Sequence, residues 1–414
     1  MSTLDEVVIA PPEPDLTPAE MIQRARAFQA RLRDEQEATE RRGTYSPEMH
    51  DAFTQAGFYR LMQPRRFGGY EFDVPTLLKV TIELARGCPG SAWCYCLAAG
   101  HHIQMAGLFS AGAQAAVYGT TGYFAAPLRP IPMGTAERVD DGWRINGEWN
   151  YCSGAPYSTH ALLAVRFRDG GTSHPVGLAV VPRDQWTPLD DWRGTVFGMS
   201  GSGSNSIRVT DAVVPDEFVV SGSLQQVPQG PTAPGYLLHG NPMYCGISEG
   251  FGPLEIAAVL VGCARAAIDE YERILREKKT MGPNPQLRYT SAEYQRWFAA
   301  AVSKTDAAED VLIRSAERYM ECCRAAVAAG RDSISVDAAR INLITHEVTF
   351  ELAWEAVELL FRTSGSGEGA RNGSRMQRYY RDFSMARTNV NPKTVLAEQA
   401  FASDYFGLGK DSVL

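Results

Sequence analysis

The C-terminal half of the chain contains three long segments with apolar residues at helical spacing, and these segments constrain the fold more than any other feature. They span residues 255–279, 292–330 and 335–364, and a shorter one follows at 377–388. Helices of this length that are joined by short connections pack their apolar faces together in an antiparallel arrangement. The sequence therefore predicts a four-helix bundle over residues 243–414.

Helical spacing also dominates residues 1–122. A threonine cap, a proline at the first helical position and a glutamate three residues after the cap occur at 17–20, and they start a helix that runs toward residue 42. A Ser-Pro pair at 46–47 starts a second helix. Apolar residues recur at helical spacing over 74–86 and 91–109. These signals predict an N-terminal helical domain.

From about residue 123 the apolar pattern alternates, as it does in half-buried strands. Asp-Asp-Gly at 140–142 and Asp-Gly-Gly at 169–171 are typical of hairpin turns. Short strands at regular spacing predict a small barrel or sandwich over residues 123–221. Residues 222–242 are rich in Gly, Pro and Gln and read as a linker to the bundle. The fold class is therefore mainly α with a central β domain.

Composition excludes several classes of function. The net charge of -8 and a pI near 5.5, without a basic run, argue against nucleic acid as a partner. Eight cysteines without CxxC spacing indicate reduced thiols in a cytoplasmic protein, and we expect no metal site. The acidic N-terminus lacks a signal peptide, and no apolar run approaches the length of a membrane span, so we expect no membrane partner.

The segment 147–154, Gly-Glu-Trp-Asn-Tyr-Cys-Ser-Gly, is the strongest candidate for a ligand site. The indole of Trp149 could cover the face of a flat ring, the hydroxyl of Ser153 could reach its edge, and Gly154 would let the backbone approach closely. A flavin has this shape. The alternative is that the aromatic residues are ordinary core residues of the β domain and that Ser153 and Gly154 form an ordinary turn.

Five local patterns, in this order along the chain, resemble the acyl-CoA dehydrogenase superfamily, and within it the flavin-dependent monooxygenase branch. The resemblance covers nearly the whole chain. The five patterns are Gly-Ser-Ala-Trp at 90–93 with His102 eleven residues after Ser91, the segment 147–154, Gly-Ser-Gly-Ser-Asn at 201–205, residues 265–276, and residues 359–366 together with Arg381 and Asp382. The resemblance implies an N-terminal helical domain, a β-barrel or sandwich, and a C-terminal four-helix bundle.

The resemblance also implies a chemistry. In this branch, reduced flavin (FADH2 or FMNH2) and O2 give a C4a-hydroperoxide, which oxygenates a small aromatic or amine substrate. By resemblance, Ser153 would hydrogen-bond the N5 region of the flavin, and His102 would face the substrate. The chain has no GxGxxG nicotinamide motif, so a separate flavin reductase is implied as a partner.

Further cofactor contacts follow from the same resemblance. Hydroxyls and amides of the segment after residue 359 would contact the flavin, and Arg276 would offer a cation, unless it belongs to a solvated helix face. The residues expected in this segment are Phe361, Thr363, Ser364, Gly365 and Ser366. Residues 335–364 carry apolar side chains on more than one helical face, which predicts a homotetramer, or at least a dimer, whose flavin sites are shared between subunits.

The sequence departs from the family at three positions. Asn389 stands in the segment where many phenol hydroxylases of this branch carry a histidine base, and an amide cannot accept a proton near neutral pH. Ser200 stands where acyl-CoA dehydrogenases often have arginine. Glu255 resembles the base of some acyl-CoA dehydrogenases, although it also suits a helix N-terminus. A flavin-dependent desaturase with Glu255 as base and a flavin-free structural homologue therefore stay open.

Overall fold

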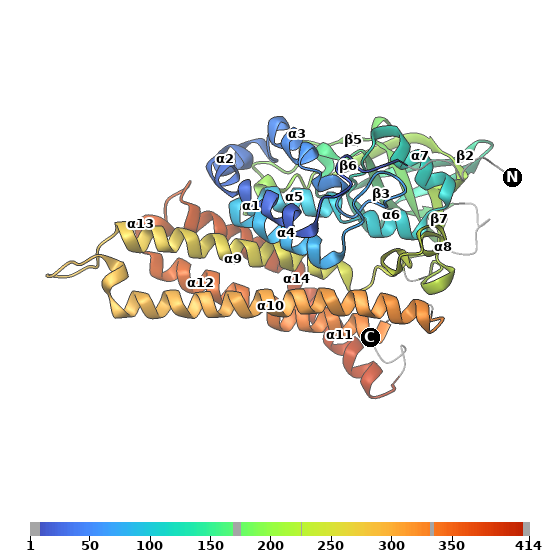
Figure 1. Ribbon diagram of the computed structural model, residues 1–414. Helices are drawn as coiled ribbons and strands as arrows, with labels where there is room; N and C mark the ends of the chain where they lie inside the picture. The colour runs from blue at the N-terminus through green and yellow to red at the C-terminus, as the bar shows by residue number, and fades with distance from the viewer. Residues whose placement is uncertain (1–8, 169–174, 225, 332–334, 409–414) are drawn as a thin grey trace.

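The computed structural model describes residues 9–168, 175–224, 226–331 and 335–408, and it contains the three predicted parts in the predicted order. Figure 1 shows the N-terminal helices and the central sheet side by side on one side of the long bundle helices. Helices α4 (Val74–Gly87) and α5 (Pro89–Ala99) pack against the bundle helix α9 (Phe251–Glu277). The N-terminal domain and the bundle therefore share one hydrophobic core.

The N-terminal part begins with the predicted capping box. The Thr17 side chain accepts the N–H of Glu20, and the Glu20 carboxylate accepts the N–H of Thr17. The helix predicted to run to residue 42 is interrupted at Phe28, whose ring packs against Phe53 and Phe58 at centroid distances of 5.4 and 5.6 Å. The remaining helices are α1 (Pro18–Ala27), α2 (Gln29–Arg42), α3 (Pro47–Gln55), α6 (His102–Leu108) and α7 (Ala111–Thr121).

The described strands form one hydrogen-bonded sheet of seven strands in the order β5-β6-β2-β1-β3-β4-β7, and the register of β1 with β3 shifts between Arg129 and Gly134. Strands β1 and β3 are parallel and the other neighbours are antiparallel. The predicted turn at 140–142 joins β1 to β2, whereas the turn at 169–171 lies outside the described residues. The strands are β1 (Leu128–Val139), β2 (Gly142–Trp149), β3 (His160–Phe167), β4 (Val176–Pro182), β5 (Thr187–Pro188), β6 (Ile207–Val214) and β7 (Val219–Ser221).

The segment after β7, predicted to be a linker, is a packed connection. It contains the short helix α8 (Pro234–His239), and Gly235 lies so close to α6 that a Cβ there would be 2.0 Å from the Ala106 carbonyl oxygen. The His239 ring nitrogen Nε2 is 2.8 Å from Gln114 Oε1 of α7. Contacts of this kind fix the connection against the N-terminal helices, so it does not act as a flexible tether.

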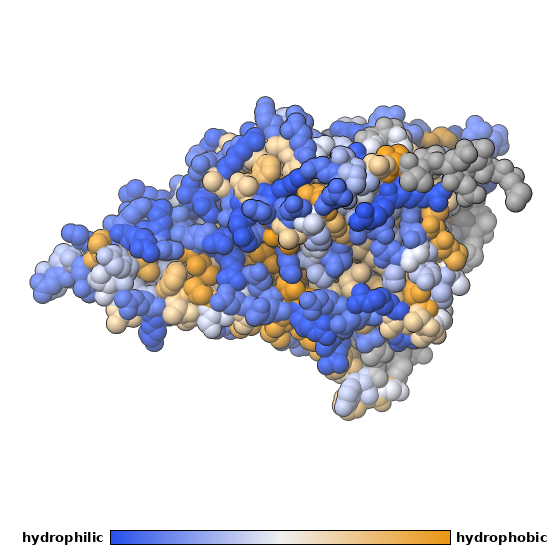
Figure 2. Space-filling view, viewed as in Figure 1, coloured by the Kyte–Doolittle hydropathy of each residue, from blue (hydrophilic) through white to orange (hydrophobic). Residues whose placement is uncertain are grey.

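The bundle consists of α9, α10 (Ala292–Ala328), α12 (Glu351–Ser364) and α14 (Arg375–Tyr405), with shorter elements between them. The segment predicted as one helix over 335–364 is α11 (Ser335–Ile344), a π-helical turn (Thr345–Phe350) and then α12. The short helix α13 (Ser366–Gly369) precedes α14. Figure 2 shows a mainly hydrophilic face on which some apolar side chains remain exposed along the bundle.

Helix α9 lies at the centre of the bundle. Among the described residues it is the one helix that is long and apolar enough to cross a membrane, so the expectation that no apolar run approaches this length was wrong. In this fold 78% of its most apolar 18-residue window is buried by protein. Its apolar surface is therefore accounted for by packing against α4, α10, α12 and α14.

Candidate functional site

A cavity of about 450 Å³ lies where the N-terminal helices, the sheet and the bundle meet. Its walls combine aromatic rings, aliphatic side chains, four hydroxyls and one guanidinium. The lining residues are Trp93 and Leu97 of α5, Leu128, Arg129 and Pro130 of β1, Tyr151 and Ser153 after β2, Trp192, Ser204, Ile256 of α9, and Met385 and Thr388 of α14. A volume of this size with a few polar groups on apolar walls is typical of small-molecule sites.

Ser153 is held at the cavity wall by a hydrogen-bond network. The indole Nε1–H of Trp93 donates to Ser153 Oγ at 3.0 Å. Ser153 Oγ lies 2.7 Å from Ser204 Oγ, which in turn lies 2.7 Å from Ser202 Oγ. Both Trp93 and Ser204 come from segments that the resemblance had singled out.

The network also determines the direction of the hydrogen bonds. Ser202 is fully buried, and Ser204 is the partner of its hydroxyl within the described part of the chain. A buried hydroxyl hydrogen without an acceptor costs about 1–3 kcal/mol, so Ser202 donates to Ser204 and Ser204 donates to Ser153. Ser153 Oγ then accepts two hydrogen bonds, and its own O–H is left to donate toward the cavity.

Gly154 is required for the packing of its own segment, and its predicted approach to a ligand stays a prediction. Its φ of +84° is in the left-handed region, and a Cβ would lie 2.7 Å from both the Ala98 Cβ and the Cys94 carbonyl oxygen. Glycine is therefore required for the close approach of this segment to α5. The neighbouring Tyr151 has a φ of +55°, which is uncommon for a residue with a side chain, and 60% of it is exposed.

Trp149 does not line the cavity, so the prediction that its indole covers the face of a ligand there was wrong. Its side chain is fully buried in the core of the β domain, where Nε1–H donates to the Ala164 carbonyl oxygen at 2.8 Å. A Cβ at Gly134 would lie 2.2 Å from the indole, so the ring occupies space that only a glycine leaves free. The aromatic rings at the cavity are those of Trp93, Tyr151 and Trp192.

His102 does not line the cavity either, so the prediction that it faces the substrate there was wrong. The side chain is fully buried, with Nδ1 3.1 Å from the Tyr118 hydroxyl and Nε2 3.0 Å from the Tyr59 carbonyl oxygen. Burial lowers the pKa of His102 to about 4. Both ring nitrogens have partners in the core, so this histidine packs and hydrogen-bonds and does not act as a base toward a ligand in this cavity.

Glu255 is buried beside the cavity without lining it. Its Oε2 lies 3.9 Å from His101 Nε2 and its Oε1 lies 4.0 Å from Cys96 Sγ. His101 Nδ1 bonds the Ala126 carbonyl oxygen at 2.8 Å, which makes Nε2 the acceptor nitrogen. Burial raises the pKa of Glu255 well above its ordinary value. Because the Glu255 carboxyl does not line the cavity, this geometry gives no support to the desaturase alternative.

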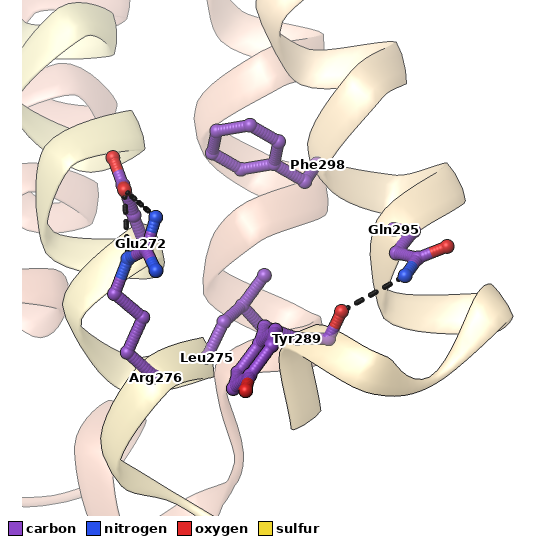
Figure 3. Close-up of a pocket in the computed structure, with 6 residues that line it drawn as sticks. All are labelled: Glu272, Leu275, Arg276, Tyr289, Gln295 and Phe298. Atoms are coloured by element: carbon purple, nitrogen blue, oxygen red, sulfur yellow. Dashed lines mark hydrogen bonds and ion pairs between the residues drawn. The ribbon is translucent and has the colours of Figure 1, made fainter. Parts of the chain in front are cut away.

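The remaining predicted cofactor residues cluster at the other end of the bundle. Arg276 is 20 residues beyond Ile256 on α9, which corresponds to about 30 Å along a helix. It pairs with Glu272 at 2.7 Å and lies 6.0 Å from the Tyr289 ring centroid, beside a second pocket of about 320 Å³ that is drawn in Figure 3. One chain therefore does not bring Arg276 and Ser153 together.

Residues 361–364 form the last turn of α12, where the hydroxyls of Thr363 and Ser364 have local partners. Thr363 Oγ1 donates to the Leu359 carbonyl oxygen at 2.6 Å, and Ser364 Oγ donates to the Phe361 carbonyl oxygen at 2.8 Å. The Phe361 ring stacks on Tyr380 at 4.0 Å. Gly365 has a φ of +96°, and Ser366 begins α13. In this structure the two hydroxyls therefore bond carbonyl oxygens within α12.

The other two departures from the family are Asn389 and Ser200. The backbone of Asn389 belongs to α14, directly after the lining residue Thr388, but its side chain is outside the described residues. Ser200 begins a helical turn beside Met199, whose N–H donates to Asp382 Oδ1 of α14 at 2.6 Å. This bond anchors the loop that carries Ser202 and Ser204.

Burial raises the pKa of Asp382 from 3.8 to about 7, which predicts a pH-dependent stability. Between about pH 4 and pH 7 the folded protein keeps a proton that the unfolded chain releases, so the free energy of unfolding should fall as pH rises through this window and level off above it. Asp382→Asn keeps an oxygen acceptor for Met199 and should flatten the curve. Urea unfolding at several pH values measures this, and an unchanged slope in the variant would assign it to other groups.

Several lining residues were not anticipated from the sequence. Arg129, Trp192, Met385 and Thr388 belong to no motif that the resemblance uses. They reach the cavity from β1, from the loop after β5 and from α14. Only their proximity in the folded chain identifies them.

The helical domain, central sheet and four-helix bundle around one cavity define the acyl-CoA dehydrogenase fold. Residues 18–116 match the family model described as acyl-CoA dehydrogenase, N-terminal domain, and residues 254–390 match acyl-CoA dehydrogenase, C-terminal domain. The chain belongs to the acyl-CoA dehydrogenase superfamily.

Its relatives place the similarity in the monooxygenase branch. A pigment production hydroxylase of Rhodococcus sp. (strain ATCC 21145) is 29% identical over 373 residues, which cover 90% of this chain and 92% of the relative. The oxygenase component of an FADH2-dependent resorcinol hydroxylase of Rhizobium sp. (strain MTP-10005) is 27% identical over 339 residues, 79% of each chain. The crystal structure of the HsaA monooxygenase from M. tuberculosis aligns with a TM-score of 0.82 and 25% identity over 95% of this chain and 98% of that one. The predicted resemblance is therefore confirmed.

Proposed function

We propose that this protein is the oxygenase component of a two-component flavin-dependent monooxygenase. It takes reduced flavin, FADH2 or FMNH2, from a separate reductase and uses O2 to oxygenate a small aromatic or amine substrate. The observation that carries the proposal is the hydroxyl of Ser153, which Trp93 and Ser204 fix at the wall of an aromatic-lined cavity between the three parts of the fold.

The residues present fit a flavin ring. Trp93, Tyr151 and Trp192 offer faces or edges to a flat ring, and Ser153 offers a hydroxyl at a fixed position. When bound, reduced flavin supplies the two electrons and the reaction with O2. The chain's part is to position the ring through Ser153 and to exclude water with apolar side chains such as Ile256.

Isotope labelling tests the proposal directly. The protein is mixed with chemically reduced FAD or FMN and a panel of phenols, indoles and aromatic amines under 18O2, and products are analysed by mass spectrometry. A product that carries one 18O atom supports the monooxygenase. Anaerobic bleaching of oxidised flavin by a substrate, without labelled product in air, would instead support the desaturase.

We also propose a homotetramer in which a second chain completes each flavin site. Arg276 lies about 30 Å along α9 from Ile256, which lines the same cavity as Ser153, and this supports the proposal because Arg276 of the same chain is too far to share that cavity. Apolar side chains at the end of α14 support it too: Tyr405, Phe406 and Leu408 are 74%, 71% and 63% exposed. Light scattering at micromolar concentration should give about four times the chain mass of 45.4 kDa, and a monomer would refute the idea.

A cytoplasmic location completes the proposal. The eight cysteines are all free and buried, which suits a reducing compartment. Fractionation of cells that produce the protein would test this assignment.

A further inference from the structure

Arg129 is the one charged residue that lines the cavity in the described part of the chain. It lies on β1, where its Nη2 donates to Asn150 Oδ1 at 3.0 Å and its guanidinium carbon is 5.8 Å from the Tyr151 ring centroid. The other lining side chains are neutral. The cavity lining therefore carries one permanent positive charge and is otherwise uncharged.

This charge is not neutralised within the described residues. Arg129 forms no ion pair there, and its buried Nε has no hydrogen-bond partner. Two other arginines of the same sheet differ: Arg138 pairs with Asp216 at 2.6 Å and Arg208 pairs with Glu148 at 2.8 Å. Both of those pairs are solvent-exposed, where an ion pair matters least, whereas the half-buried Arg129 lacks one.

We propose that Arg129 binds an anionic oxygen group of a molecule held in this cavity. A charge-assisted hydrogen bond from a guanidinium is the strongest polar contact that the lining can offer. The inference rests on the proposed function and adds a chemical class of ligand: an aromatic ring that carries a carboxylate or phenolate oxygen. The same chemistry is present on the flavin, in its phosphate groups, and the experiment separates the two sources.

The position of Arg129 also bears on the missing base. A cation near a phenolic oxygen favours the ionised phenolate and lowers the pKa of the phenol. A phenol bound beside Arg129 would therefore lose its proton to solvent more readily, and a histidine at Asn389 would not be required for that step. Arg129 acts here as a specificity-determining residue that stabilises charge and does not itself transfer a proton.

Equilibrium binding tests the inference without turnover. Arg129→Met is compared with Arg138→Met, a control on the same strand whose arginine lies outside the cavity lining. Two matched ligand pairs are titrated by calorimetry without O2: 4-hydroxyphenylacetate against its neutral amide, and chemically reduced FMN against chemically reduced riboflavin. Arg129→Met should lower the binding affinity for at least one anionic ligand by about tenfold or more, as expected for the loss of a charged hydrogen bond. The affinity for the neutral ligand of the same pair should change by less than about threefold.

The ligand pair in which Arg129→Met lowers the affinity for the anionic member alone shows whether the anion belongs to the substrate or to the flavin. Arg129→Lys keeps the charge and should retain most of the discrimination, which also controls for a folding defect of the methionine variant. Equal effects on charged and neutral members of both pairs, or the same effects from Arg138→Met, would overturn the inference. A wild-type protein that binds no reduced flavin would instead refute the proposed function, and the assignment of Arg129 with it.

Discussion

Ser153→Ala is expected to leave the protein folded while most of the O2 that it consumes is released as H2O2 and not transferred to substrate. The substitution removes the hydroxyl that faces the cavity, and it also removes the acceptor of the Trp93 indole N–H. One net hydrogen bond is worth about 0.5–1.5 kcal/mol, and a buried donor left without a partner costs about 1–3 kcal/mol. The ratio of H2O2 to product should therefore rise by roughly tenfold, since 1.4 kcal/mol is a factor of ten.

The measurement compares peroxide and product per reduced flavin consumed. Ser206→Ala is the matched control, because Ser206 is buried two residues after Ser204 but does not line the cavity. Flavin affinity should change little in either variant, since the ring keeps its apolar contacts. A Ser153→Ala protein with wild-type coupling would reduce Ser153 to a turn residue, the alternative that the sequence left open.

Trp149→Ala should lower the free energy of unfolding by about 3–5 kcal/mol, the usual range for truncating a fully buried tryptophan. The indole fills the space above Gly134 and Gly147, where a Cβ would lie 2.2 and 2.8 Å from its ring atoms. Its removal leaves a cavity that Gly134 and Gly147 cannot fill, because they have no side chains. Trp149→Phe keeps a ring and should cost less.

Urea denaturation followed by circular dichroism measures the change in stability. In protein that is still folded, flavin affinity should stay close to that of the wild type, because Trp149 is in the core of the β domain and does not line the cavity. The opposite result, full stability with lost flavin binding, would restore the role that the sequence alone suggested for this residue.

The sequence by itself determined the order of the three parts and several local details. The capping box at Thr17, the hairpin turn at 140–142 and the long bundle helices depend on residues close together in the chain, so periodicity and turn chemistry are sufficient to predict them. The resemblance likewise located Ser153 on the segment that reaches the cavity. These features are local, and local physics specifies them.

Only the tertiary structure decided which side chains share the cavity. Trp149 and His102 have chemistry that suits a ligand site, yet packing turns both into the core, where each finds a hydrogen-bond partner. Arg129 and Met385 belong to no motif, and about 250 positions of sequence separate them. No local sequence pattern can therefore indicate that both line the same cavity. The direction in which a side chain points depends on the neighbours that the completed fold supplies, and for these residues the neighbours come from distant parts of the chain.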